Sequence, residues 1–176
     1  IINNTVTGAL PETSYYFIFL TAGSNDNLIA NNSVSGSLMA GNGIYVQQSS
    51  ENNTIQNNVV TLSDSRGISI LNSNYNNILY NNLSTDPDTM DYDAIYLYNS
   101  NESTISFNNL YADANAMFLE GSALRLSDSH NNVIGENNLS ASDDEAYSLY
   151  LTQGSSGNLF SNNFVTVFFD FSEFGS

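Results

Sequence analysis

The chain has 176 residues, which is enough for one domain with a continuous core. Its 18 acidic residues against two arginines give a net charge of −16, which argues against nucleic acid and anionic membrane surfaces as partners because both need a basic face. The same charge argues against a polyuronate substrate unless a divalent cation bridges the like charges. It has no Cys, which excludes disulfides and thiolate metal sites, and no apolar stretch long enough to insert across a bilayer.

An Asn-Asn pair recurs along the chain every 24–29 residues. The pairs are Asn3-Asn4, Asn31-Asn32, Asn57-Asn58, Asn81-Asn82, Asn108-Asn109, Asn137-Asn138 and Asn162-Asn163. A fixed period in this range is the signature of a solenoid, so residues 1–176 are read as one solenoid domain. Because the chain begins with Ile1 rather than Met, we expect a processed form or a segment of a longer protein.

Each repeat opens with two apolar residues that flank one outward position, the pattern of a strand buried on one face. These pairs are Ile18/Leu20, Ile44/Val46, Ile68/Ile70, Ile95/Leu97, Leu124/Leu126 and Leu149/Leu151. A second strand is predicted to point Ile29, Ile55, Leu79, Ile105, Ile134 and Phe160 inward, and a third to point Val34, Val59, Leu83, Leu110, Leu139 and Phe164 inward. Three short strands per repeat predict a parallel β-helix of about six coils, spaced about 4.8 Å apart.

The Asn columns have a physical reason. Asn tolerates the left-handed backbone of a sharp corner, and stacked Asn amides can hydrogen-bond in a ladder. One ladder is predicted through Asn32, Asn58, Asn82, Asn109, Asn138 and Asn163. Another is predicted through Asn27, Asn53, Asn77, Ser103, Asn132 and Asn158.

The pattern resembles the right-handed parallel β-helix proteins of the pectin-lyase-like superfamily, and in particular the NosD-type repeats of bacterial and archaeal surface proteins. The segments that carry the resemblance run from Gly43 to Asn58 and from Gly67 to Asn82. The resemblance implies an all-β solenoid and an extracellular or cell-surface location. It leaves function open, because the superfamily contains lyases, hydrolases, tailspikes, adhesins and scaffolds.

Catalytic candidates are few. The resemblance implies a basic proton abstractor and Ca²⁺ for lyases of this superfamily, and only Arg66 and Arg125 are basic here. Asp128 and His130 are the one acid/base pair of different type, and exposed corner residues are the alternative reading. One His, three Met and no Cys argue against the copper handling associated with the NosD name.

Acidic residues gather in the loops between repeats. Alternating carboxylates at Asp86, Asp88, Asp91 and Asp93 form a candidate Ca²⁺ site, with a solvated polar face as the alternative. We otherwise expect no cofactor. Among the Asn-x-Ser/Thr sequons, Asn52 and Asn101 lie at corners and are the candidate glycan acceptors.

The outward positions of the first strands read Phe19, Tyr45, Ser69, Tyr96, Arg125 and Tyr150. Such a column can bind a surface polysaccharide, contact another subunit or stabilise the sheet. The termini provide a second contact region, with Ile1 and Ile2 in second-strand phase and Phe168, Phe169, Phe171 and Phe174 in roughly first-strand phase.

Open solenoid ends expose unpaired backbone groups, so the leading hypothesis is a structural or adhesive surface protein whose copies stack into a sheath or filament. The alternative is a carbohydrate-binding or polysaccharide-cleaving domain.

Overall fold

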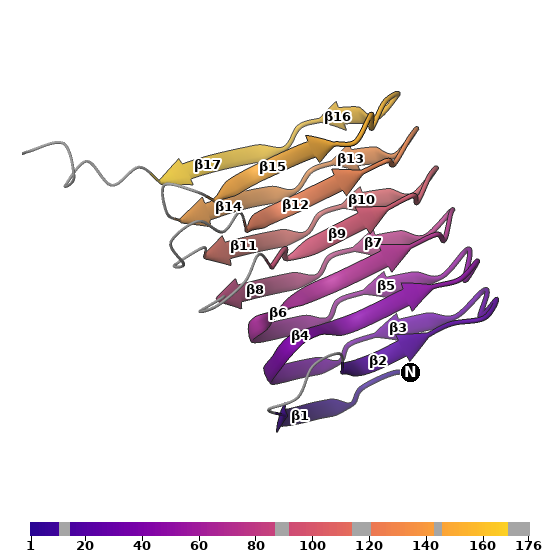
Figure 1. Ribbon diagram of the computed structural model, residues 1–176, viewed down its shortest axis with the longest axis vertical. Coiled ribbons are helices and arrows are strands. Elements are labelled where there is room, and N and C mark those ends of the chain that lie inside the picture. Colours follow the sequence, from indigo (N-terminus) through magenta and orange to yellow (C-terminus); the bar gives the residue numbers. More distant parts are fainter. Residues whose placement is uncertain (11–14, 87–91, 114–120, 143–145, 169–176) are drawn as a thin grey trace, which may run out of the picture.

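The structure is a computed structural model that describes residues 1–10, 15–86, 92–113, 121–142 and 146–168. Within these ranges all regular structure is β-strand. The strand pairs are parallel, and the coils stack along one axis (Figure 1). The predicted parallel β-helix is therefore confirmed. No helix in the described ranges has the length and apolar character needed to cross a membrane.

Each coil has three strands. The first strands are β2 (Tyr16–Leu20), the ends of β4 (Ser33–Gln47) and β6 (Val59–Leu71), β9 (Ile95–Tyr98), β12 (Ser122–Ser127) and β15 (Tyr147–Thr152). The second strands are β3 (Leu28–Ala30), β5 (Thr54–Gln56), β7 (Asn77–Leu79), β10 (Thr104–Ser106), β13 (Val133–Gly135) and β16 (Leu159–Ser161). The third strands are β1 (Thr5–Leu10), the starts of β4 and β6, β8 (Asn82–Asp86), β11 (Asn109–Asp113), β14 (Asn138–Ser142) and β17 (Phe164–Phe168).

The strands form two sheets. The second strands make a six-stranded sheet of their own. First and third strands share an 11-stranded sheet, because β4 and β6 each run from a third strand straight into the next first strand. The first strands therefore present one continuous outer face along the solenoid.

Apolar side chains of one kind stack along the axis to make the core. The second strands align Ile29, Ile55, Ile78, Ile105 and Ile134, all with no exposed surface. Each buried Ile stabilises the fold by about 1.5–3 kcal/mol relative to an exposed one. The predicted inward pairs of the first strands are confirmed from Ile18/Leu20 to Leu124/Leu126. In the last described coil Leu149 packs against the core, whereas Leu151 is 39% exposed.

Side-chain amides form two ladders inside the coils. In the inner ladder each Asn donates its backbone N–H and its Nδ2 to the Oδ1 of the next coil over 2.9–3.0 Å. Its rungs are Asn4, Asn32, Asn58, Asn81, Asn108, Asn137 and Asn163. The other ladder runs through Asn27, Asn53, Asn76, Ser103, Asn132 and Asn158. The ladders satisfy buried polar groups that would otherwise destabilise the fold.

Half of the predicted inner ladder is wrong by one residue. Asn82, Asn109 and Asn138 lie outside, in an exposed row where Asn138 donates to Asn109 and Asn109 donates to Asn82. The inner rung follows a corner residue with positive φ, and that residue is Asn31, Asn57, Tyr80, Phe107, Glu136 or Asn162. Where the corner residue is Asn, it is the first residue of the Asn-Asn pair and the second is the rung. Where the corner residue is Tyr80, Phe107 or Glu136, the first Asn of the pair is the rung and the second lies outside.

Other predicted positions were also misplaced by one residue. Ile78 and Val60 fill the core in place of the predicted Leu79 and Val59. Asn76 replaces the predicted Asn77 as a rung, and Val165 rather than Phe164 pairs with buried Leu139.

Candidate functional site

The outer face of the first strands carries two columns of side chains. Phe19, Tyr45, Ser69, Tyr96, Arg125 and Tyr150 are aligned in register, as predicted. A second column lies three residues earlier and consists of Tyr16, Asn42, Arg66, Asp93, Ser122 and Tyr147. Two aromatic regions at the ends of the face thus flank a polar centre.

Small residues between the columns let adjacent coils pack closely. A Cβ on Gly67 would lie 2.4 Å from the carbonyl oxygen of Ala94, so no larger residue fits there. Gly43, one coil earlier, is similarly enclosed, with its Cβ position 2.8 Å from the Gly67 carbonyl oxygen. The side chains of the two columns are consequently held beside one another.

The two arginines of the chain converge on one buried carboxylate at this polar centre. Arg66 Nε lies 3.4 Å from Asp93 Oδ2, and Arg125 Nη1 lies 3.9 Å from the same oxygen. The Asp93 side chain has no exposed surface, whereas those of Arg66 and Arg125 are 31% and 19% exposed. The carboxylate therefore lies beneath two guanidiniums that remain open to solvent.

Burial raises the pKa of Asp93 from an ordinary 3.8 to about 6, and the nearby Arg66, Arg125 and Ser122 side chains act in the opposite direction. Asp93 Oδ1 makes no hydrogen bond of ordinary geometry with the described residues. With Asp93 ionised the cluster carries a net charge of about +1, and protonation raises it to about +2. This small cationic region stands out on a strongly acidic protein.

Aromatic rings hold the guanidiniums in place. Arg66 Cζ lies 4.8 Å from the centroid of the Tyr96 ring, and Arg125 Cζ lies 4.7 Å from that of Tyr150 and 5.9 Å from that of Tyr96. These are cation–π distances. The rings and the buried carboxylate together hold the two planar guanidiniums in fixed positions. The guanidiniums are therefore suited to bind a carboxylate or another planar anion.

A family model described as a right handed beta helix region matches residues 1–165. The chain belongs to the right-handed β-helix family. The expected right-handed β-helix is therefore confirmed, and the NosD-type character of the repeats stays a prediction.

Among solved structures, this β-helix protein is similar to a crystal structure of a double mutant of the periplasmic alginate epimerase AlgG. The match has a TM-score of 0.58 and 20% identity, and it covers 89% of this chain and 43% of that chain. The chain thus spans less than half the length of that structural neighbour, and at this identity the likeness shows the fold alone. No curated protein matches the sequence of this chain.

The structure describes two of the four predicted Ca²⁺ residues. Asp86 ends β8 and is exposed, Asp93 lies under the arginines, and Asp88 and Asp91 lie outside the described residues. Within the described ranges no three His, Cys, Asp or Glu side chains cluster as metal ligands would. The Asp93 side chain points into the outer face of the first strands, beside the two arginines, and the calcium site stays a prediction.

Both sequon candidates already make hydrogen bonds. Asn52 is exposed and donates Nδ2 to Asp26, while the Asn101 Oδ1 accepts the His130 N–H at 2.7 Å. Glycosylation at either position stays a prediction.

The terminal residues lie at opposite ends of the stack. Ile1 and Ile2 are about half exposed, and Ile2 pairs with Ala30 in the expected second-strand phase. Phe168 ends a third strand, β17, which corrects the expected first-strand phase. Phe169, Phe171 and Phe174 lie outside the described residues.

Proposed function

We propose that this β-helix protein binds an acidic polysaccharide along the outer face of its first strands. The observation that carries the proposal is the convergence of Arg66 and Arg125 on buried Asp93, with the guanidiniums lying over the rings of Tyr96 and Tyr150. A uronate residue offers a carboxylate for a guanidinium and a ring face for a tyrosine. Acidic polysaccharide as the ligand class also agrees with the alginate epimerase as structural neighbour.

The overall charge of −16 repels a polyanion, but most of these charges lie far from the arginines that would bind it. At physiological salt, repulsion between exposed charges is largely screened beyond about 8 Å. Contacts between a guanidinium and a carboxylate are short-range and directional, and each is worth about 1.5–3 kcal/mol. Local recognition at the arginines therefore outweighs distant repulsion.

Replacing Arg125 by Gln is expected to weaken binding of a uronic acid oligosaccharide by about 10–100-fold, because one charge-assisted contact is lost. Arg66→Gln should have a similar effect. Titration calorimetry at about 0.15 M salt measures the dissociation constants. The matched control is Tyr75→Ser, which removes an exposed aromatic from a corner on the second sheet and should leave affinity unchanged. Equal binding by the arginine variants, or equal binding of neutral and acidic oligosaccharides, would contradict the proposal.

We propose as a second function that copies of the chain stack end to end, as in a surface sheath or filament. The inner ladder has a direction, since each Asn donates to the Oδ1 of the following coil. Among the described residues, nothing donates to Asn4 Oδ1 and nothing accepts the Asn163 N–H. The two ends are thus complementary in hydrogen bonding.

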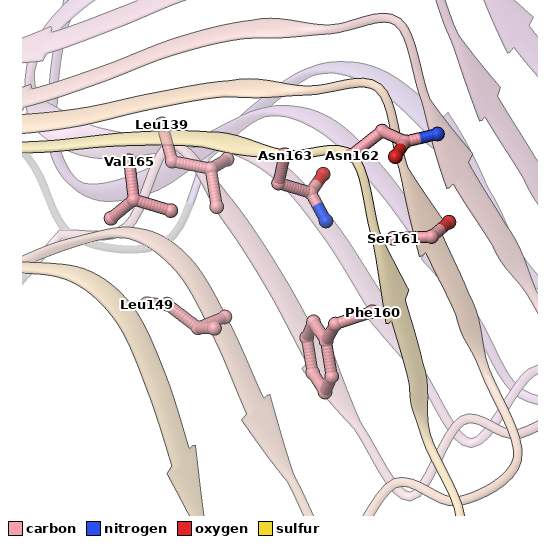
Figure 2. Close-up of a pocket in the computed structure, with 7 residues that line it drawn as sticks. All are labelled: Leu139, Leu149, Phe160, Ser161, Asn162, Asn163 and Val165. Atoms are coloured by element: carbon pink, nitrogen blue, oxygen red, sulfur yellow. The ribbon is translucent and has the colours of Figure 1, made fainter.

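The end near Asn163 is also hollow. A pocket of about 260 Å³ opens there between Leu139, Leu149, Phe160 and Val165 (Figure 2). Inside the stack this space is filled by side chains of the next coil. The first coil of a second copy supplies apolar side chains and a ladder acceptor of the required polarity.

Val165→Asp is expected to keep the protein monomeric, because it places a charge in this pocket. Val133→Asp is the matched control, as Val133 is exposed on the outer side of the second sheet. Analytical ultracentrifugation and electron microscopy over a concentration series, with and without Ca²⁺, compare the variants with the wild type. Discrete wild-type monomers under every condition would exclude the assembly.

A further inference from the structure

A serine, a histidine and an aspartate meet at the corner between the first and second strands of the last two described coils. Asp128 and His130 directly follow β12, and Ser156 occupies the same corner one coil later. His130 Nε2 lies 3.3 Å from Asp128 Oδ1, and His130 Nδ1 lies 2.9 Å from Ser156 Oγ. Asp128 and His130 follow the strand that contains Arg125, but this corner does not belong to the outer face described above.

The hydrogen bonds fix where the imidazole proton resides. The backbone N–H of Ser156 points at His130 Nδ1 over 3.2 Å, so Nδ1 must present a lone pair. The proton of the neutral ring then sits on Nε2, facing the Asp128 carboxylate. The Ser156 hydroxyl is the closer of the two groups at Nδ1 and donates to it. The order carboxylate, imidazole, hydroxyl is that of an activated serine nucleophile.

The corner columns show that two of these three residues depart from the repeat. Asn72 and Asn99 occupy the column of Asp128, and Asn74 and Asn101 occupy that of His130. Asn74 and Asn101 each accept the N–H of the next coil through Oδ1, at 2.8 and 2.7 Å. His130 accepts the Ser156 N–H in the same way, so Asn would satisfy the backbone equally well. The structural role of the rung therefore does not explain the change to His.

We propose that Asp128, His130 and Ser156 form a serine esterase site for small carboxylic esters. Ser156 Oγ attacks the ester carbonyl while its proton passes to His130 Nδ1, and the C–O bond to the alcohol breaks as the leaving oxygen takes that proton. Water then attacks the acyl–serine ester, again losing its proton to Nδ1. The carboxylic acid departs as Ser156 Oγ regains the proton. Asp128 stabilises the imidazolium in both steps.

Backbone donors for the developing oxyanion lie next to the serine. Within the described residues, the N–H groups of Gly157 and Asn158 have no acceptor. Gly157 has a φ of +70°, and the equivalent corner residue one coil earlier, Asn131, also has a positive φ of 56°. The amide after the nucleophile is a common oxyanion donor. Exposed Ser156 and the half-exposed Asp128 leave the site open to water, which suits hydrolysis of small esters rather than burial of a large substrate.

The test uses a fluorophosphonate probe and p-nitrophenyl acetate on the full chain. Peptide mass spectrometry should find the label, and the acetyl group in a quenched reaction, on Ser156. Ser156→Ala should abolish both modifications. His130→Asn should slow labelling at least about tenfold without changing the unfolding midpoint, because Asn preserves the rung. Ser155→Ala is the matched control, since the Ser155 hydroxyl donates to Thr152 O and accepts the Ser129 N–H rather than bonding to the imidazole.

Label spread over several serines, or unchanged Ser156 labelling in His130→Asn, would overturn the proposal. An unfolding midpoint lowered by His130→Asn, with labelling unaffected, would show a purely structural rung. Neither outcome bears on polysaccharide binding, which depends on Arg66 and Arg125.

Discussion

Asn81→Ala is expected to lower the free energy of unfolding by about 3–5 kcal/mol, whereas Asn82→Ala next to it should change that energy by about 0.5 kcal/mol or less. Asn81 Oδ1 accepts two hydrogen bonds from Asn58, and its Nδ2 donates to Ile55 O and to Asn108. Truncation leaves the buried Asn58 N–H and the Ile55 carbonyl without these partners, and it opens a small cavity. The exposed Asn82 side chain accepts one hydrogen bond, from Asn109, among the described residues.

Urea unfolding followed by circular dichroism measures both variants under one condition, and the shift of the midpoint gives the difference. Equal losses for the two variants, or a larger loss for Asn82→Ala, would show that the inner ladder follows another register.

Asp93→Asn is expected to stabilise the protein by about 3 kcal/mol at pH 8. In the wild type at this pH the Asp93 carboxylate is charged although its burial favours the neutral form, and Asn removes that charge. The pKa of Asp93 is about 6 when folded and 3.8 when free, so the folded state binds the proton more tightly. The contribution of Asp93 to stability is complete below pH 3.8 and is lost as the pH rises through about 6.

Between pH 8 and pH 5, the difference in unfolding free energy between wild type and Asp93→Asn should narrow by roughly half. Unfolding midpoints at several pH values test this, and taking the difference cancels the titration of the other carboxylates. Asn82→Ala, at an exposed position without a titratable side chain, serves as the control, and its difference from the wild type should stay constant over this pH range. A less stable Asp93→Asn at pH 8 would instead mean that attraction to Arg66 and Arg125 exceeds the effect of burial.

The solenoid could be predicted from the sequence because two independent periods agree: alternation within strands and recurrence between coils. The exact phase of the middle coils could not. In these coils the corner position, which favours Asn, is occupied by Tyr80, Phe107 or Glu136. The Asn-Asn pair there covers the inner rung and the residue after it, instead of the corner residue and the rung. Equating them across coils moved the rung from Asn81 to Asn82 and the core residue from Ile78 to Leu79.

The arginine cluster was harder to find. The sequence places Arg125 correctly in the outward column, but Asp93 lies three residues before Tyr96, at the end of an acidic loop. Alternation with other aspartates suggested calcium. The second outer column arises because small residues such as Gly67 let the coils approach each other. From the sequence, it becomes visible only when the residues three positions before the first outer column are compared between repeats. Similarly, Ser156 becomes a neighbour of His130 only when the corners are stacked.

Arginine side-chain NMR gives the most direct test of polysaccharide binding. Since the chain has two arginines and no lysine, the Nε–H region should contain two signals, from Arg66 and Arg125. Both signals should shift on addition of a uronic acid oligosaccharide and saturate with one shared dissociation constant, and neither should move with a neutral oligosaccharide of equal length. Signals that stay in place, or that move equally with sodium acetate, would contradict the proposal that this face recognises an acidic polysaccharide.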